Sequence, residues 1–241
     1  MTPYIAEFFG TALLILLGDG VVANVVLAKS KGNGSGWIVI ATGWGLAVMV
    51  AVYAFASQSG AHLNPAIKIG LAAIGQFPLG KVAGYIVAQI AGGILGGALV
   101  WLAYLPHWKE TPDASAKLSV FCTIPAIRNP MANVMCEIIG TTVLVFGALA
   151  IPSSHNLTRP GWATGFGPLL IGLLIFAIGL SLGGPTGYAI NPARDLGPRI
   201  AHAILPIAGK GGSDWGYAWV PIVGPIVGGV LGAFAYKALL G

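Results

Sequence analysis

Apolar residues lie along this chain in long continuous runs, not in the short alternating patterns typical of soluble sheets. A run of about twenty apolar residues is long enough to cross the hydrocarbon core of a bilayer as a helix. Such runs occur at about residues 4–27, 36–57, 79–105, 131–151, 162–182 and 215–239. The pattern therefore predicts an all-α protein with six transmembrane helices.

Two shorter apolar stretches, at about 65–76 and 192–204, are too short to span a bilayer. Both begin with the tripeptide Asn-Pro-Ala, formed by Asn64, Pro65 and Ala66 and by Asn191, Pro192 and Ala193. Asparagine is a favoured N-cap, and proline is well tolerated at the first position of a helix. The stretches predict two re-entrant half-helices that begin near the membrane centre and together cross it.

The two halves of the chain resemble each other. "AEFFGTALLILLG" (6–18) is matched by "CEIIGTTVLVFGA" (136–148), "SGAHLNPA" (59–66) by "TGYAINPA" (186–193), and "QIAGGILGG" (89–97) by "PIVGGVLGA" (225–233). Three matches in the same order indicate a duplication. Because each half holds three spans, the second half must be inverted in the membrane. We expect a single membrane domain, 1–241, with inverted repeats 1–105 and 131–241 joined by a loop at 106–130.

The composition agrees with a membrane protein and excludes several classes of function. Charged residues make up 8% of the chain, against roughly 25% in soluble domains, and the mean hydropathy is +0.84. The twelve basic residues are spread thinly, which argues against nucleic-acid binding. The cysteines and histidines show no metal-ligand spacing, so we expect no metal, no cofactor and no enzyme activity. We expect three of the histidines in loops or at the membrane interface: His107, His155 and His202.

The segments before the two half-helices must be irregular backbone at membrane depth. Such backbone is tolerated only where it is buried in protein or lines a water-filled path. Its carbonyl groups are therefore expected to line a pore: Gly60, Ala61, His62 and Leu63, and Gly187, Tyr188, Ala189 and Ile190. Glu7 and Glu137 occupy equivalent positions in the two halves. We expect each to accept hydrogen bonds from amides of its re-entrant segment, with proton relay as the alternative role.

Two Asn-Pro-Ala motifs in inverted three-span halves resemble the aquaporin family over nearly the whole chain. Within it, "GPTGYAINPARDLGPR" (184–199) is similar to the glycerol-facilitator branch. The resemblance implies a selectivity filter formed by Trp44, Gly179, Tyr188 and Arg194. In this filter Arg194 and the loop carbonyls would form hydrogen bonds with the hydroxyl groups of a polyol. The rings of Trp44 and Tyr188 would contact its C–H groups, and Gly179, which has no side chain, would keep the opening wide. Tyr188 replaces the phenylalanine common in facilitators, which leaves the preferred solute open.

The resemblance implies a passive channel for glycerol and other small neutral solutes, with water as a co-permeant. Arg194 and the positive ends of the half-helices would oppose cations and protons, and the apolar wall would not replace the hydration that any ion loses. One alternative is a channel whose main solute is neutral lactic acid or another small uncharged metabolite. A secondary transporter is a further alternative, but it needs coupling-ion ligands, and we expect no spare intramembrane acid for that role. Asp195, directly after Arg194, is an alternative structural partner for the arginine.

The resemblance also implies a homotetramer in the plasma membrane, and short termini favour a bacterial cytoplasmic membrane. Both termini are expected in the cytoplasm by resemblance, although the distribution of basic residues alone would place the N-terminus outside. Small residues four apart on the third and sixth spans predict close packing between the halves. They form the pairs Gly92/Gly96, Gly93/Gly97, Gly224/Gly228 and Gly228/Gly232.

Overall fold

The computed structural model describes residues 1–153, 156–159 and 161–241, so His155 lies outside the described residues. All regular elements in these ranges are helices. They are α1 (Pro3–Val26), α2 (Trp37–Ser59), α3 (Pro65–Ala73), α4 (Leu79–Ala103), α5 (His107–Glu110), α6 (Ala114–Phe121), α7 (Pro130–Ala150), α8 (Trp162–Leu182), α9 (Pro192–Ile204) and α10 (Val220–Leu239). Six of them, α1, α2, α4, α7, α8 and α10, are long and apolar enough to cross a membrane. The predicted fold class is confirmed.

The connection at 106–130, expected to be a loop, contains the short helices α5 and α6. Asp113 starts α6, because its side chain accepts a hydrogen bond from the Ser115 amide at 2.8 Å. Trp108 and Phe121 are buried, and their ring centroids lie 5.5 Å apart. The segment was predicted as a loop because it is rich in proline and charged residues, and its few apolar residues, which anchor it to the bundle, are separated along the sequence.

The half-helices also differ in detail from the prediction. α3 ends at Ala73, three residues early, and Gly75 follows with a φ of 81°. Gly75 thus turns the chain toward α4. The expectation for His202 was wrong, because it is fully buried in α9 and its Nδ1 lies 2.9 Å from the Ser213 hydroxyl. The sixth span begins at Val220 instead of 215, after a series of turns.

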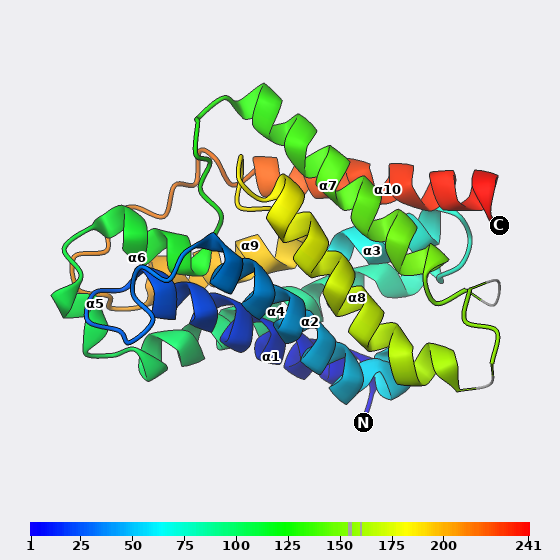
Figure 1. Ribbon diagram of the computed structural model, residues 1–241, viewed down its shortest axis with the longest axis horizontal. Coiled ribbons are helices and arrows are strands. Elements are labelled where there is room, and N and C mark those ends of the chain that lie inside the picture. The colour runs from blue at the N-terminus through cyan, green and yellow to red at the C-terminus, as the bar shows by residue number, and fades with distance from the viewer. Residues whose placement is uncertain (154–155, 160) are drawn as a thin grey trace.

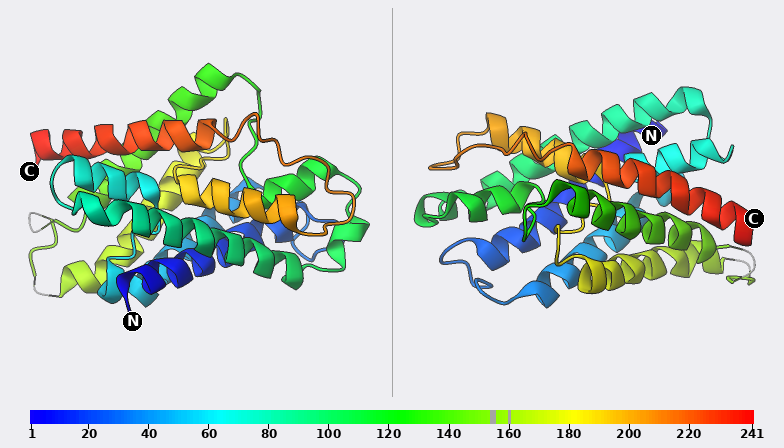
Figure 2. Two further views of the ribbon diagram at one scale, coloured as in Figure 1. Left: turned by 180° about the vertical axis from the view of Figure 1, so that it is seen from behind. Right: turned by 90° about the horizontal axis from the view of Figure 1, so that it is seen from above.

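The long helices run roughly along one axis, with both chain termini at one end and α5 and α6 at the other (Figure 1). α3 and α9 lie on opposite sides of the middle of the molecule along this axis (Figures 1 and 2). Each half-helix packs against a long helix of the other half, since α3 contacts α10 and α9 contacts α4. The two halves are therefore interlocked and do not simply lie side by side.

Glycines allow the helices of α4 and its neighbours to approach at backbone distance. A Cβ atom at Gly92 would lie 2.2 Å from the Phe8 carbonyl oxygen in α1, and one at Gly93 would lie 2.9 Å from the Ala193 carbonyl in α9. Gly97 also faces α9, whereas Gly96 faces α1. The predicted packing between the halves is thus right for Gly93 and Gly97 and wrong for Gly92 and Gly96, which pack within the first half.

The glycines of α10 divide in the same way. Gly224, Gly228 and Gly232 face α7 of their own half, and a Cβ at Gly228 would lie 2.4 Å from the Ile138 carbonyl. Gly229 faces the other half, with 2.6 Å to the Ala66 carbonyl in α3. The pairs Gly224/Gly228 and Gly228/Gly232 therefore do not pack between the halves as predicted. Adjacent glycines such as Gly228 and Gly229 lie on different faces of α10, so they contact different helices.

Gly92→Ala is expected to lower the free energy of unfolding by about 1–3 kcal/mol, because the added methyl group collides with a backbone carbonyl that cannot move aside. Gly80→Ala in the same helix is the matched control, since nothing lies within 4 Å of its Cβ position. The control should be unchanged or more stable by up to about 1 kcal/mol. Unfolding in mixed detergent micelles, followed by circular dichroism, measures both. Equal stability of the two variants would contradict the close α1–α4 contact.

Candidate functional site

The segments that lead into α3 and α9 adopt the same unusual backbone conformation. Ala61 and Tyr188, at equivalent positions, have φ values of 42° and 39°, and Leu63 and Ile190 have φ values of 50° and 42°. Non-glycine residues rarely adopt positive φ, and the strain costs about 1–3 kcal/mol each. Such strain persists only where the surrounding structure fixes the backbone.

Glu7 of α1 fixes the first of these segments. Its carboxylate accepts hydrogen bonds from the amides of His62 at 3.2 Å and Leu63 at 2.8 Å, and from the side-chain amide of Gln89 at 2.7 Å. Glu7 is fully buried. A buried carboxylate is tolerated in a membrane protein when several donors surround it, and here the donors belong to the strained backbone itself.

Glu137 of α7 does the same in the second half. Its carboxylate accepts hydrogen bonds from the amides of Ala189 at 3.0 Å and Ile190 at 2.8 Å, and from the hydroxyl of Thr186 at 2.7 Å. Both glutamates therefore bind the last two amides before an Asn-Pro-Ala motif. This leaves the carbonyl groups of these segments free to point elsewhere.

Asn64 and Asn191 join the two halves at the centre. Each side-chain oxygen accepts a hydrogen bond from the backbone amide two residues on, at 2.9 Å and 3.0 Å, and so caps its own half-helix. The Asn64 amide group donates to the Ile190 carbonyl and the Asn191 amide group to the Leu63 carbonyl, both at 2.8 Å. Two of the eight carbonyls expected in the pore thus also accept an internal hydrogen bond. Each asparagine retains a second amide hydrogen for a further acceptor.

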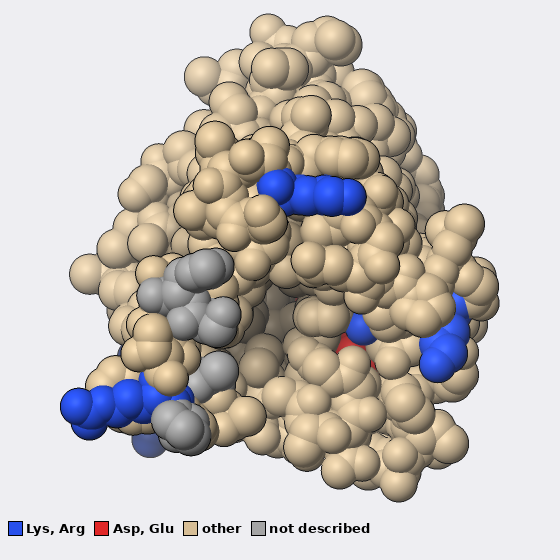
Figure 3. Space-filling model, turned by 90° about the vertical axis from the view of Figure 1, so that its right-hand side faces the viewer, with Lys and Arg blue, Asp and Glu red and all other residues tan. Residues whose placement is uncertain are grey.

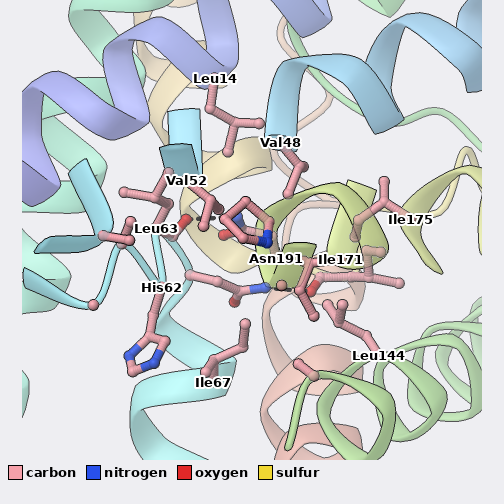
Figure 4. A pocket seen from close by; sticks show the side chains of 18 of the residues that line it. Leu14, Val48, Val52, His62, Leu63, Ile67, Leu144, Ile171, Ile175 and Asn191 are labelled. Carbon is pink, nitrogen blue, oxygen red and sulfur yellow. Dashed lines mark hydrogen bonds between the residues drawn. The ribbon is translucent and has the colours of Figure 1, made fainter. Parts of the chain in front are cut away.

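A cavity of about 430 Å³ runs past this centre. Its lining combines the two re-entrant segments with residues of α1, α2, α7 and α8, most of which are apolar. In Figure 4 the side chains of Leu14, Val48 and Ile175 face the region around Asn191. At the end that carries the termini, the surface is hollowed in the middle, and the Lys and Arg side chains of this face stand mostly around the hollow (Figure 3). The cavity lining therefore combines polar groups near the two Asn-Pro-Ala motifs with apolar side chains of the long helices.

The structure brings the four residues predicted as a filter into two contacting pairs. The guanidinium carbon of Arg194 lies 4.0 Å from the centre of the Trp44 ring. A Cβ at Gly179 would lie 2.8 Å from Cζ of Tyr188, so the glycine makes room for the tyrosine ring. Trp44, Tyr188 and Arg194 line the cavity. The Tyr188 hydroxyl is buried and has no hydrogen-bond partner among the described residues.

Sequence reasoning missed Asp19 of α1. It is fully buried, and its Oδ1 lies 3.3 Å from Nη1 of Arg194. Asp19 is not spare for a coupling ion, because it is already paired with Arg194. Asp195, the alternative partner of Arg194, instead pairs with Arg199 at 2.8 Å. A lone aspartate inside an apolar span was the signal that could have identified Asp19, because such residues are costly and mark functional sites.

Comparison with known proteins agrees with these features. The model of the family described as "Major intrinsic protein" matches residues 1–236. The chain is 64% identical over 239 residues to a "Probable glycerol uptake facilitator protein" of Thermotoga maritima, covering 99% of this chain and 100% of that one. It is 58% identical to "Glycerol uptake facilitator protein 3" of Lactiplantibacillus plantarum, covering 98% and 95%.

Two further matches bear on the choice of solute and on the fold. A "D/L-lactic acid transporter" of Lactiplantibacillus plantarum is 41% identical, covering 98% of this chain and 97% of that one. Among solved structures, the aquaglyceroporin from Plasmodium falciparum superposes with a TM-score of 0.87 and 32% identity, covering 98% and 95%. The likeness thus extends over the whole bundle.

Glu137→Gln is expected to release the second re-entrant segment. The new amide group can accept through only one oxygen, so at least one buried backbone N–H loses its partner, at a cost of about 1–3 kcal/mol. Hydrogen exchange of the peptide covering 186–190 should accelerate, while that of 59–63, bound by Glu7, should not. Glu110→Gln, in an exposed ion pair with Lys29, is the control for loss of one carboxylate. Unchanged exchange at 186–190 would contradict the bracing role of Glu137.

Proposed function

The chain belongs to the major intrinsic protein family, and on that premise we propose that it is a passive channel for glycerol and other small neutral solutes, with water as a co-permeant. It is a multi-pass protein of the bacterial plasma membrane. The observation that carries the proposal is the cavity lined by both polar and apolar residues, in a chain 64% identical to a protein named as a glycerol uptake facilitator.

Glycerol matches such a cavity because its three hydroxyl groups can lie along one side of the molecule and its C–H groups along the other. The guanidinium of Arg194 and the carbonyls of the re-entrant segments offer hydrogen bonds on the polar side. The rings of Trp44 and Tyr188 contact the C–H groups of glycerol. A solute that passes in this orientation exchanges its water for protein groups with little loss of hydrogen bonding.

Ions are disfavoured by the same arrangement. The N-termini of α3 and α9 lie close together, because the N-cap asparagine of each donates to a carbonyl just before the other helix, and each N-terminus carries a partial positive charge of about half an elementary unit. Cations are repelled there, and any ion loses hydration that the apolar wall of Leu14, Val48 and Ile175 cannot replace. The asparagine amide groups can orient a solute oxygen between them.

A channel is favoured over a secondary transporter because the buried acids are already engaged. Glu7 and Glu137 bind backbone amides, and Asp19 pairs with Arg194, so no carboxylate cluster is left for a coupling ion in the described part of the chain. We propose that the protein is not an enzyme and uses no cofactor. Neutral lactic acid is the second candidate solute, because its size and hydroxyl pattern approach those of glycerol and a 41% identical relative is named for it.

Three organisational features belong to the same proposal. The domain consists of inverted repeats 1–105 and 131–241 with the connection 106–130 between them. Four copies assemble as a homotetramer with one pore in each subunit. Both termini face the cytoplasm, which is compatible with their position at one end of the bundle (Figure 1).

Proteoliposomes that contain the protein should swell in a glycerol gradient much faster than protein-free liposomes, as measured by stopped-flow light scattering. The rate should rise in proportion to the gradient and need no ion gradient, because a pore does not cycle between conformations. Flux that saturates and requires an ion gradient would overturn the channel proposal.

A pH series in the same vesicles separates the two candidate solutes. Lactic acid flux should follow the protonated fraction and fall as pH rises through the acid's own pKa, whereas glycerol flux should not change. Lactic acid flux above glycerol flux at equal concentrations of neutral solute would favour the second candidate.

Tyr188→Phe is expected to leave the ratio of glycerol to 1,2-propanediol permeability within about twofold of wild type, because the lost hydroxyl is buried and makes no hydrogen bond that a solute could share. The diol lacks one hydroxyl, so the ratio would fall if this hydroxyl bound glycerol. Tyr217→Phe is the matched control, since its hydroxyl is also buried without a partner in the described structure but does not line the cavity. A ratio that falls by more than about twofold in Tyr188→Phe alone would contradict this expectation and assign the hydroxyl a role in solute selection.

A further inference from the structure

We propose that Asp19 is a positioning residue that holds Arg194 in the constriction and cancels its charge, so that the channel rejects anions as well as cations. The inference rests on the proposed function and deepens it by naming a residue that decides charge selectivity. Nothing in the Asn-Pro-Ala motifs or in the four filter positions points to this residue.

The geometry around the guanidinium carries the proposal. Nη1 of Arg194 lies 3.3 Å from Oδ1 of Asp19 and 3.4 Å from the carbonyl oxygen of Phe121, and the guanidinium carbon stacks 4.0 Å from the Trp44 ring centre. Arg194 is 6% exposed and Asp19 is 0% exposed. The ion pair is therefore shielded from solvent, where Coulomb interactions are much stronger than at a surface.

Other buried acids do not compete for Arg194. The carboxylate of Asp195, although adjacent in sequence, binds Arg199 at 2.8 Å and 3.1 Å and accepts hydrogen bonds from the amide and hydroxyl of Thr123. Glu7 and Glu137 bind the re-entrant segments. Among the described residues, Asp19 supplies the carboxylate that faces the cation of the filter.

Gly18, the residue before Asp19, also helps to position the filter side chains. A Cβ at Gly18 would lie 2.3 Å from the Trp44 ring, so Gly18 admits the tryptophan while Asp19 holds the arginine that stacks on it. One turn of α1 thus sets the position of two filter side chains. Asp19 itself is not among the residues that line the cavity. It acts through Arg194 and does not touch the solute.

The charge of the pair has a direct consequence for selectivity. An uncompensated arginine in a narrow pore attracts anions, as in anion-selective channels. A carboxylate 3.3 Å away reduces this attraction, while the N–H groups of the guanidinium on the pore side remain donors for a neutral hydroxyl. The pair therefore retains the hydrogen-bonding function of Arg194 without making the constriction an anion site.

Asp19→Asn tests this with little change of shape, because asparagine keeps an oxygen acceptor for Arg194 and loses only the charge. Nitrate is the probe, since it is small and has no neutral form at neutral pH. In proteoliposomes with valinomycin to carry potassium, swelling in potassium nitrate reports nitrate entry. The ratio of nitrate to glycerol permeability should rise by about tenfold or more over wild type, equivalent to about 1.4 kcal/mol.

Glu110→Gln is the matched control, because it removes one carboxylate from an exposed ion pair and should leave the ratio unchanged. An unchanged or lower ratio in Asp19→Asn would overturn the proposal, since it would mean that Asp19 carries no charge against Arg194 or does not act on the pore.

The reciprocal variant keeps the test decisive if Asp19→Asn does not fold. Arg194→Gln leaves the Asp19 carboxylate uncompensated, and it should raise potassium permeability above that of the double variant Arg194→Gln/Asp19→Asn. A purely structural role of Asp19 predicts no such difference, and equal potassium fluxes would overturn the proposal. Failure of the wild-type protein to conduct glycerol would instead overturn the proposed function, whatever the ion fluxes of the variants.

Discussion

Backbone polar groups at membrane depth must find partners inside the protein, and the rest of this structure depends on that constraint. Two segments before the half-helices leave helical geometry where no lipid group can satisfy them. Glu7 and Glu137 bind the amides of these segments from one side. Once their amides are held, the carbonyls can face a cavity, and the strain of positive φ at Leu63 and Ile190 is sustained.

The same constraint explains why the two halves interlock. Asn64 and Asn191 each cap their own half-helix and donate to a carbonyl of the opposite segment. This exchange requires the two helix starts to meet closely, and the glycines of α4 and α10 permit it. Gly93 meets α9, and Gly229 meets α3 at backbone distance. Close packing and central hydrogen bonding are therefore parts of one arrangement.

The residues around Arg194 divide into those that line the cavity and those that lie behind them. Trp44, Tyr188 and Arg194 line the cavity, whereas Gly179 and Gly18 act by leaving space for aromatic rings. Asp19 lies behind Arg194 and decides how much of the arginine's charge reaches the pore in our proposal. A pore for neutral polar molecules needs strong hydrogen-bond donors without a strong net charge, and a buried ion pair is one way to obtain both.

The sequence alone determined the six spans, the two half-helices and the inverted repeat, because length, apolarity and Asn-Pro signals act locally along the chain. It did not reveal α5 and α6, whose anchors Trp108 and Phe121 are separated by polar residues, nor the burial of His202. Only the tertiary structure decided which glycine faces which helix and that Arg194 pairs with Asp19 instead of Asp195. Those outcomes depend on how each helix is rotated about its axis and on contacts between residues far apart in the chain. The spacing of residues along the sequence does not specify either.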